Sequence, residues 1–189
     1  MTSSCPSSFA RFVNGASVWL SRAARIVAPP VMRLALAVPF FLSGLTRWDG
    51  FPSLSPTAEY LFTEEFRLHL FGEAYDFPFP VVVAHLVGMA EIALPVLLVL
   101  GLGTRFVALG LLAMTAVIQL VVPDGWSNFH LPWAGLALGI IALGPGALSL
   151  DGLIGRRRRL APAGAAEAAR KAFVGATAQS VSPAKPEIS

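Results

Sequence analysis

The sequence is poor in charge and in cysteine, and each shortage excludes a class of protein. Asp, Glu, Lys and Arg make up 13% of the 189 residues, against 55% hydrophobic residues and a mean hydropathy of +0.67. A soluble domain of this length has too little interior to bury so much apolar side chain, so the composition indicates an integral membrane protein. The single cysteine, Cys5, excludes an internal disulfide and any CxxC or zinc-finger spacing.

Motifs of the common catalytic and cofactor sites are lacking as well. The sequence contains no GxGxxG, Walker loop, HExxH, GxSxG or haem-attachment CxxCH. Its isoelectric point near 9.6 comes from arginines clustered beside apolar runs, a pattern that suits topology and lipid headgroups better than nucleic acid. We therefore expect the lipid bilayer and not nucleic acid as a partner, no metal site and no covalently bound cofactor.

Four long apolar segments are what the sequence has instead, at about residues 31–46, 81–100, 106–122 and 131–150. The last three are long enough to span a bilayer as helices. The first is short, so we expect it to begin near Ile26, with Arg33 reaching toward the headgroups. The predicted fold is an all-α membrane protein, an antiparallel bundle of four transmembrane helices.

The distribution of arginines predicts the orientation of this bundle. Residues 47–80 carry six acidic residues and two arginines, whereas four arginines with no acid among them precede or begin the first span (Arg11, Arg22, Arg25 and Arg33) and four more follow the fourth (Arg156 to Arg159). By the positive-inside rule, both termini of this multi-pass protein are expected in the cytoplasm. The predicted division is an interfacial N-terminal segment (1–26), the transmembrane domain (27–155) and a basic, then disordered, tail (156–189).

The first outer loop is expected to contain an amphipathic helix. Ser55 is a suitable N-cap and Pro56 a suitable first helical residue. Apolar residues then recur near one face and acidic residues on the other, the apolar ones being Leu61, Phe62, Phe66 and Leu70. We expect this helix to lie on the outer membrane surface or against the bundle.

Glu91 is the leading candidate functional residue. It is the only carboxylate between Val81 and Gly103 and lies near the middle of its predicted helix. A carboxylate at that depth costs a few kcal/mol and must face the bundle, protonated or paired. Two interpretations stay open: a proton carrier or polar ligand for a small molecule such as a quinone, or an interhelical hydrogen bond to Ser43 or Thr115.

A second set of polar residues is expected near the outer ends of the spans. His85, Gln119 and His130 lie at similar depths and, with Asp49 or Asp124, could form a polar vestibule. A metal or quinone-headgroup site is one interpretation. The other is that these histidines simply meet water and headgroups, since they lack the spacing of metal ligands.

Three stretches resemble the DoxX family of small membrane proteins. They are "RLALAVPFFLSGLTRW" at 33–48, "AEIALPVLLVLGLGTRFVALGLLAMT" at 90–115 and "LGPGALSLDGLIGRR" at 143–157. The resemblance implies the four-helix fold in a bacterial cytoplasmic (inner) membrane, and it matches recurrent polar positions with Arg33, Glu91 and His130. The family is named for a subunit associated with thiosulfate:quinone oxidoreduction in archaea. Similar bacterial members are encoded beside a multinuclear-iron peptide-modifying oxidase, in clusters connected with metal stress.

From these observations we expect a membrane component of a redox or metal-stress system. It would act as a quinone-interacting or anchoring subunit and not as a self-sufficient enzyme, with a membrane redox protein or metal-stress operon proteins as partners. The alternatives are a non-enzymatic scaffold or assembly protein and a small transporter, for which a homo-oligomer could supply a pathway.

Overall fold

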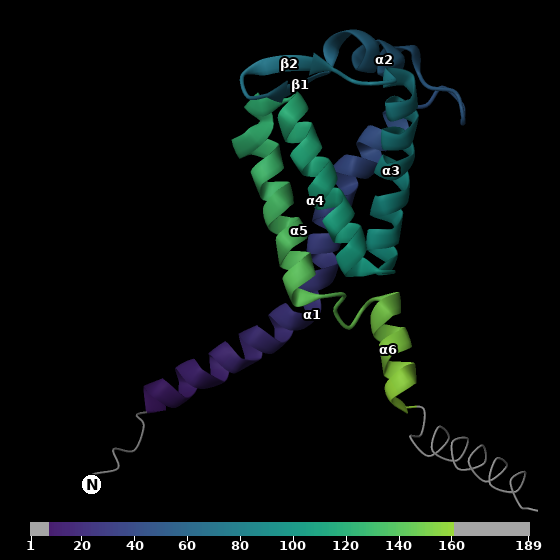
Figure 1. Cartoon of the computed structure of the whole chain (residues 1–189). Coiled ribbons are helices and arrows are strands. Elements are labelled where there is room, and N and C mark those ends of the chain that lie inside the picture. The colour runs from purple at the N-terminus through teal and green to yellow at the C-terminus, as the bar shows by residue number, and fades with distance from the viewer. Residues whose placement is uncertain (1–7, 161–189) are drawn as a thin grey trace, which may run out of the picture. The chain divides into compact units, whose positions relative to one another are not determined.

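The computed structural model describes residues 8–160, which are mostly helical (Figure 1). Within this part of the chain three helices are long and apolar enough to cross a membrane: α1 (Ser8–Thr46), α3 (Pro80–Leu100) and α4 (Thr104–Val121). A shorter helix, α5 (Leu131–Leu143), packs with them. These features are those of an integral membrane protein built from α-helices.

Helix α1 is longer than the sequence predicted. Its span was expected to begin near Ile26, yet the helix runs without a break from Ser8 through Pro29, Pro30 and Pro39. Each proline removes a backbone donor, but the helix continues past all of them. Within this helix Arg33 Nε donates to the Pro29 carbonyl oxygen one turn earlier, at 3.4 Å.

Helices α3 and α4 form a tight antiparallel hairpin. Gly101 and Gly103 adopt positive φ angles of 71° and 57°, a conformation that favours glycine, and they end α3 and begin α4. We call this end of the bundle the turn end and the opposite end, where the α1–α3 connection (residues 47–79) lies, the connection end.

The fourth helix ends earlier than predicted. The apolar segment was expected to span residues 131–150, but α5 ends at Leu143, and a loop precedes α6 (Leu150–Leu160). Gly144 and Gly146, with φ angles of 79° and 73°, flank Pro145 and stop the helix. On its N-terminal side α5 continues a π-helical turn (Trp126–His130) that follows a 3₁₀ turn (Pro123–Gly125). The first compact unit of the chain ends at Gly152.

The α1–α3 connection contains a shorter helix than expected and a hairpin that was not predicted. Ser55 accepts a hydrogen bond from Ala58 N at 3.2 Å and begins α2 (Pro56–Tyr60), which continues as a π-helical turn (Leu61–Glu65). Strand β1 (Arg67–Leu70) then pairs antiparallel with β2 (Glu73–Asp76), and Arg67 bonds Asp76 at 2.7 Å. The helix therefore does not reach Leu70, because the strand pairing takes over the backbone hydrogen bonds.

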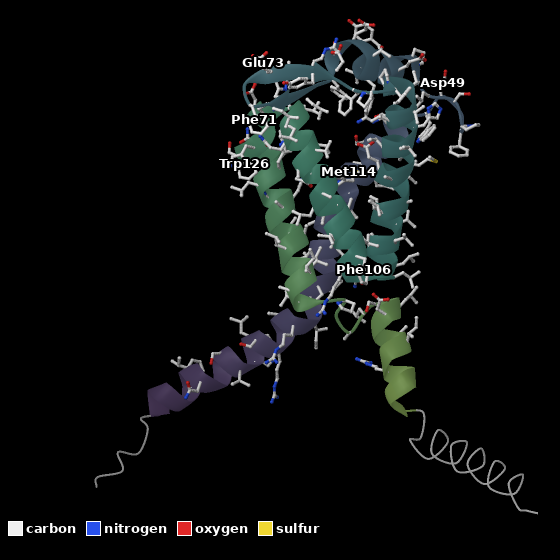
Figure 2. All side chains as sticks on the ribbon, viewed as in Figure 1. Asp49, Phe71, Glu73, Phe106, Met114 and Trp126 are labelled. Atoms are coloured by element: carbon white, nitrogen blue, oxygen red, sulfur yellow. The ribbon has the colours of Figure 1, made fainter. Side chains whose placement is uncertain are left out.

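The core of the bundle is small and its outer surface is apolar. Leu36 and Phe40 of α1, Leu98 of α3, Leu111 of α4 and Ile140 of α5 are buried together. Large apolar side chains also cover the outside, where Phe106 and Trp126 are 82% and 49% exposed (Figure 2). A surface of this kind is stable only where hydrocarbon replaces water around it.

Candidate functional site

Two arginines of the α1 region, Arg33 and Arg47, lie near opposite ends of the bundle with 2% and 13% exposure. Arg33 binds groups at the turn end. Its side chain does not reach toward headgroups as predicted; Arg33 is only 2% exposed and points into the protein. It donates to the carbonyl oxygen of Val99 at 3.4 Å and to that of Leu148. Since the last carbonyls of a helix lack partners within it, Arg33 ties the end of α3 to the loop after α5.

Asp151 completes this arrangement from the other side of the turn. Its carboxylate accepts hydrogen bonds from Gly103 N at 3.0 Å, Thr104 N at 2.9 Å and Thr104 Oγ1 at 3.0 Å. It therefore caps α4, whose own N-cap residue is a glycine without a side chain. Burial alone would raise the pKa of Asp151, but these hydrogen bonds and the charge of Arg33 outweigh it and lower that pKa below its ordinary value.

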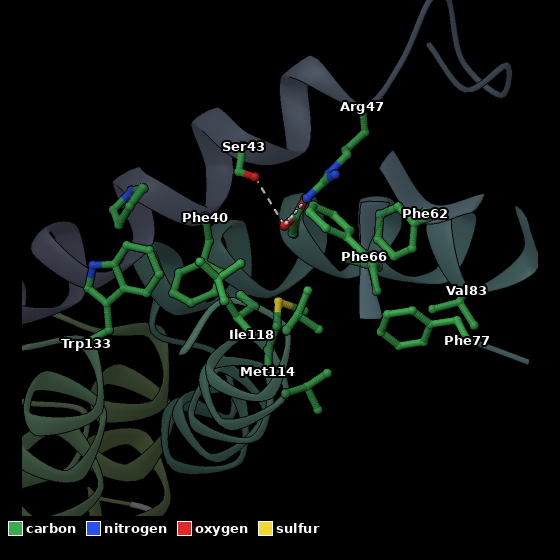
Figure 3. Close-up of a pocket in the computed structure, with 16 residues that line it drawn as sticks. Phe40, Ser43, Arg47, Phe62, Phe66, Phe77, Val83, Met114, Ile118 and Trp133 are labelled. Carbon is green, nitrogen blue, oxygen red and sulfur yellow. Dashed lines mark hydrogen bonds and ion pairs between the residues drawn. The ribbon is translucent and has the colours of Figure 1, made fainter. Parts of the chain in front are cut away.

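The second buried cluster surrounds Glu91, which is 2% exposed. Ser43 Oγ donates to Glu91 Oε1 at 3.2 Å, and Arg47 donates through Nε to Oε2 at 3.0 Å and through Nη2 to Oε1 at 3.3 Å (Figure 3). The guanidinium thus grips the carboxylate side-on with two parallel bonds, which fixes both side chains. The contact is possible because Gly44 lets the helices approach; a Cβ there would lie 3.0 Å from Glu91 Cβ.

Arg47 is the functional candidate that sequence reasoning missed. The sequence places Arg47 among the charges of the first outer loop, although it follows Ser43 by one helical turn and so shares its face. Of the two hydroxyl residues that the sequence offers as partners of Glu91, the structure brings Ser43 to the carboxylate. The hydroxyl of Thr115 donates instead to the Leu111 carbonyl of its own helix, at 2.8 Å. The spacing Ser-Gly-x-x-Arg at the end of α1 was the available signal.

A cavity of about 190 Å³ lies beside the Arg47–Glu91 pair. Its polar lining is confined to Ser43, Arg47 and Glu91, and α3 and α4 contribute apolar, non-aromatic side chains to the rest of the wall. Five aromatic residues complete the wall: Phe40, Phe62, Phe66, Phe77 and Trp133 (Figure 3). Arg47 also stacks over the Phe62 ring at 5.2 Å from its centroid, so the charge is held at one end of an aromatic chamber.

The structure brings His130 and Gln119 together, as a hydrogen-bonded pair. Gln119 Nε2 donates to the Pro123 carbonyl at 3.0 Å, which turns Gln119 Oε1 toward His130 Nδ1 at 2.6 Å. His130 therefore donates through Nδ1. It is 3% exposed, and its ring lies 5.6 Å from that of Trp133, a residue of the cavity wall.

His85, Asp49 and Asp124 do not join this pair in a common vestibule. His85 Nδ1 lies 2.8 Å from the Val81 carbonyl oxygen of its own helix, and the imidazole packs edge-on against Trp48 at 5.9 Å. Asp49 and Asp124 are exposed. Between residues 8 and 160 no group of three His, Cys, Asp or Glu side chains could hold a metal ion.

Comparison with known proteins identifies one family. The model of the DoxX family matches residues 28–124, just over half of the chain, from the residue before Pro29 of α1 to the 3₁₀ turn before α5. The matched range includes Arg33, Ser43, Arg47, Glu91 and Gln119 and ends before His130 and Asp151. No curated protein and no solved structure matches the chain.

Proposed function

The chain belongs to the DoxX family of membrane proteins, and we propose that it is the quinone-interacting, membrane-anchoring subunit of a redox or metal-stress system. In this proposal the cavity beside Glu91 holds the quinone ring. A separate redox protein exchanges electrons with the bound quinone. The observation that carries the proposal is the aromatic chamber with a single ion pair at one end.

The size and walls of the cavity suit one substituted ring. Apolar protein cavities of about 150 Å³ are known to bind benzene, and this cavity measures about 190 Å³. Phe40 and Trp133, whose ring centroids are 5.0 Å apart, and Phe62 offer faces and edges against which a planar ring packs well.

The ion pair suits both redox forms of a quinone. An arginine has more N–H donors than the two that Glu91 accepts, so Arg47 can also donate to a quinone carbonyl. A carboxylate has more acceptor positions than Ser43 and Arg47 use, so Glu91 can also accept a quinol hydroxyl. Both groups are already oriented by each other, which lowers the entropic cost of binding a ligand.

Binding of decylubiquinone to the purified protein in lipid nanodiscs tests this proposal. Arg47→Gln is expected to weaken binding by about tenfold or more, because a charged donor to the headgroup is lost. Leu45→Ala is the matched control, since Leu45 belongs to the same end of α1 but is 52% exposed and points away from the cavity. A wild-type protein that binds no quinone, or an Arg47→Gln variant that binds it as well as the control does, contradicts the proposal.

The membrane placement that goes with this function has four spans: α1, α3, α4 and the helical stretch from Trp126 to Leu143. We place both termini in the cytoplasm of a bacterial inner membrane, with the N-terminal part of α1 and the amphipathic α2 segment at opposite membrane surfaces. The arginine distribution supports this orientation. In a Cys5→Ser background, a membrane-impermeant thiol reagent should label Glu73→Cys but not Gly155→Cys in intact cells; the reverse pattern contradicts the orientation.

A scaffold or assembly protein is the second candidate, and one observation favours it. Both oxygens of Glu91 already accept hydrogen bonds from the α1 region, so the cluster also serves to join α1 to α3. If this is its whole purpose, Glu91→Gln should fold and keep the physiological phenotype, and mild-detergent purification should recover partner proteins without quinone.

A further inference from the structure

We infer that the ligand of this cavity enters sideways from the hydrocarbon of the bilayer, between α3 and α4, and carries an apolar tail that lies in that opening. This inference rests on the proposed function, because it concerns the same cavity. It narrows the ligand class to lipid-soluble rings with a long tail and assigns the tail its own place in the fold.

The volume of the cavity requires a second place for any tail. At about 190 Å³ the cavity exceeds only slightly the ~150 Å³ known to hold benzene. A ring with small substituents fills it, and an alkyl or isoprenoid chain attached to that ring must leave through the wall.

The wall is open along α4 near the connection end. Val117 and Val122 line the cavity and are also 45% and 42% exposed, so each touches both the interior and the outer surface. Across the gap, Val83 and Val87 of α3 line the cavity and are half-buried. The backbones of the two helices meet at the Gly101–Gly103 turn and diverge toward the connection end (Figure 1), where residues of both helices line the same cavity.

The side chains at the gap are chemically suited to a hydrocarbon tail. All α3 and α4 residues that line the cavity near the gap are apolar, namely Val83, Val87, Met114, Val117, Ile118 and Val121. Those of α4 recur at helical spacing, so one stripe of α4 between Met114 and Val121 faces the cavity. The only charged groups of the lining are Glu91, which belongs to α3, and Arg47, which directly follows α1.

The connection end is closed by aromatic rings. Phe62 is 4% exposed and packs against Phe66 and Phe77, with ring centroids 5.2 Å and 5.9 Å from its own. Arg47 stacks on the same Phe62 ring. This cluster lies between the cavity and the polar connection, so the apolar gap is the easier route.

The experiment compares a tailed and a tailless ligand on the same variants. Decylubiquinone and its tailless analogue 2,3-dimethoxy-5-methyl-1,4-benzoquinone are titrated into nanodiscs, with each concentration expressed per bilayer lipid so that partitioning cancels. Val117→Trp fills the gap. Leu109→Trp is the matched control, because Leu109 is 54% exposed on the same helix and does not line the cavity.

We expect Val117→Trp to weaken decylubiquinone binding by about tenfold or more and to change binding of the tailless ring by no more than about twofold. Leu109→Trp should change neither. Val122→Trp is a second filling variant and should act as Val117→Trp does, which keeps the test decisive if one variant fails to fold.

Equal binding of decylubiquinone to Val117→Trp, Val122→Trp and wild type overturns the lateral opening, even when the cavity binds quinone. An equal loss of tailed and tailless ligands in the filling variants also overturns it, because the ring itself is then displaced. A wild-type protein that binds neither ligand overturns the proposed function instead, so the two failures are distinguishable.

Discussion

Arg33 and Arg47 belong to the same stretch of chain and are both largely buried, yet they meet different partners. Arg33 donates to backbone carbonyls of Val99 and Leu148, groups whose positions are fixed by the ends of helices. Arg47 pairs with a side-chain carboxylate and borders a cavity. An arginine that donates to backbone carbonyls, as Arg33 does, stabilises the fold. An arginine that pairs with a carboxylate beside a cavity, as Arg47 does, keeps further N–H donors for a ligand.

The largest effect is expected when one partner of the Arg47–Glu91 pair is removed and the other stays. Glu91→Ala leaves the guanidinium without its counter-ion and should lower the free energy of unfolding by about 3–5 kcal/mol. Replacing both partners, as Arg47→Met with Glu91→Leu, removes the uncompensated charge and should bring stability back to within about 1 kcal/mol of wild type. Denaturant unfolding in detergent micelles measures both; a double variant as unstable as the single one would mean that this pair, too, serves the fold.

The turn end should respond in the opposite way. Arg33→Met leaves the carbonyls of Val99 and Leu148 without a donor and should cost about 2–3 kcal/mol in the same unfolding measurement. Here a second substitution, Asp151→Asn, should give no recovery, since the carbonyls stay unsatisfied. Recovery in this double variant would make the two arginines alike and remove the distinction drawn above.

Asp151 alone should have a smaller effect that depends on pH. Asp151→Ala removes the cap of α4 and should cost about 1 kcal/mol near neutral pH. Because the pKa of Asp151 is lowered in the folded state, its stabilising contribution is present above the ordinary value of 3.8 and is lost as the pH falls through the lower folded-state pKa. The stability difference between wild type and Asp151→Ala should therefore shrink below about pH 4; a difference that stays constant down to pH 2 contradicts the role of the carboxylate.

The smallest changes in stability are expected for Ser43 and Thr115, the two hydroxyl residues that the sequence offers as partners of Glu91. Ser43→Ala removes a hydrogen bond to a carboxylate and should cost about 1 kcal/mol. Thr115→Val removes only a bond to the Leu111 carbonyl within α4 and should stay within about 0.5 kcal/mol of wild type, with unchanged quinone binding. Equal costs for the two variants would argue that Thr115 also acts on Glu91.

The sequence contains enough to predict the apolar helices, the tight turn at Gly101 and the inward position of Glu91, because hydropathy and glycine act locally. The end of α5 at Leu143 could have been inferred from Gly-Pro-Gly, but hydropathy outweighed the turn residues. The strands at Arg67–Leu70 and Glu73–Asp76 form because they pair with each other. The apolar residues before and within the first strand have helical spacing, so the sequence favoured a helix there.

The candidate site was predictable only in part. Ser43 and Glu91 follow from depth in neighbouring helices. Arg47 lies at the boundary of a helix, where the choice between loop charge and buried partner depends on how closely α1 and α3 approach at Gly44. Asp151 caps a helix whose first residue lies 47 positions earlier, and no local pattern reports such a contact.

The contact between Asp151 and the start of α4 also concerns the order in which the chain is made. Residues 101–104 leave the ribosome well before residue 151. When the α3–α4 hairpin forms, the amide groups of Gly103 and Thr104 therefore still lack the Asp151 carboxylate that they bind in the finished protein. The last part of the bundle to be synthesised supplies that partner, and Arg33 gains the Leu148 carbonyl at the same stage. A nascent chain stopped before residue 148 would thus hold all its long apolar helices, and the bonds of Ser43 and Arg47 to Glu91, while still lacking the Leu148 acceptor and the Asp151 cap at the turn end.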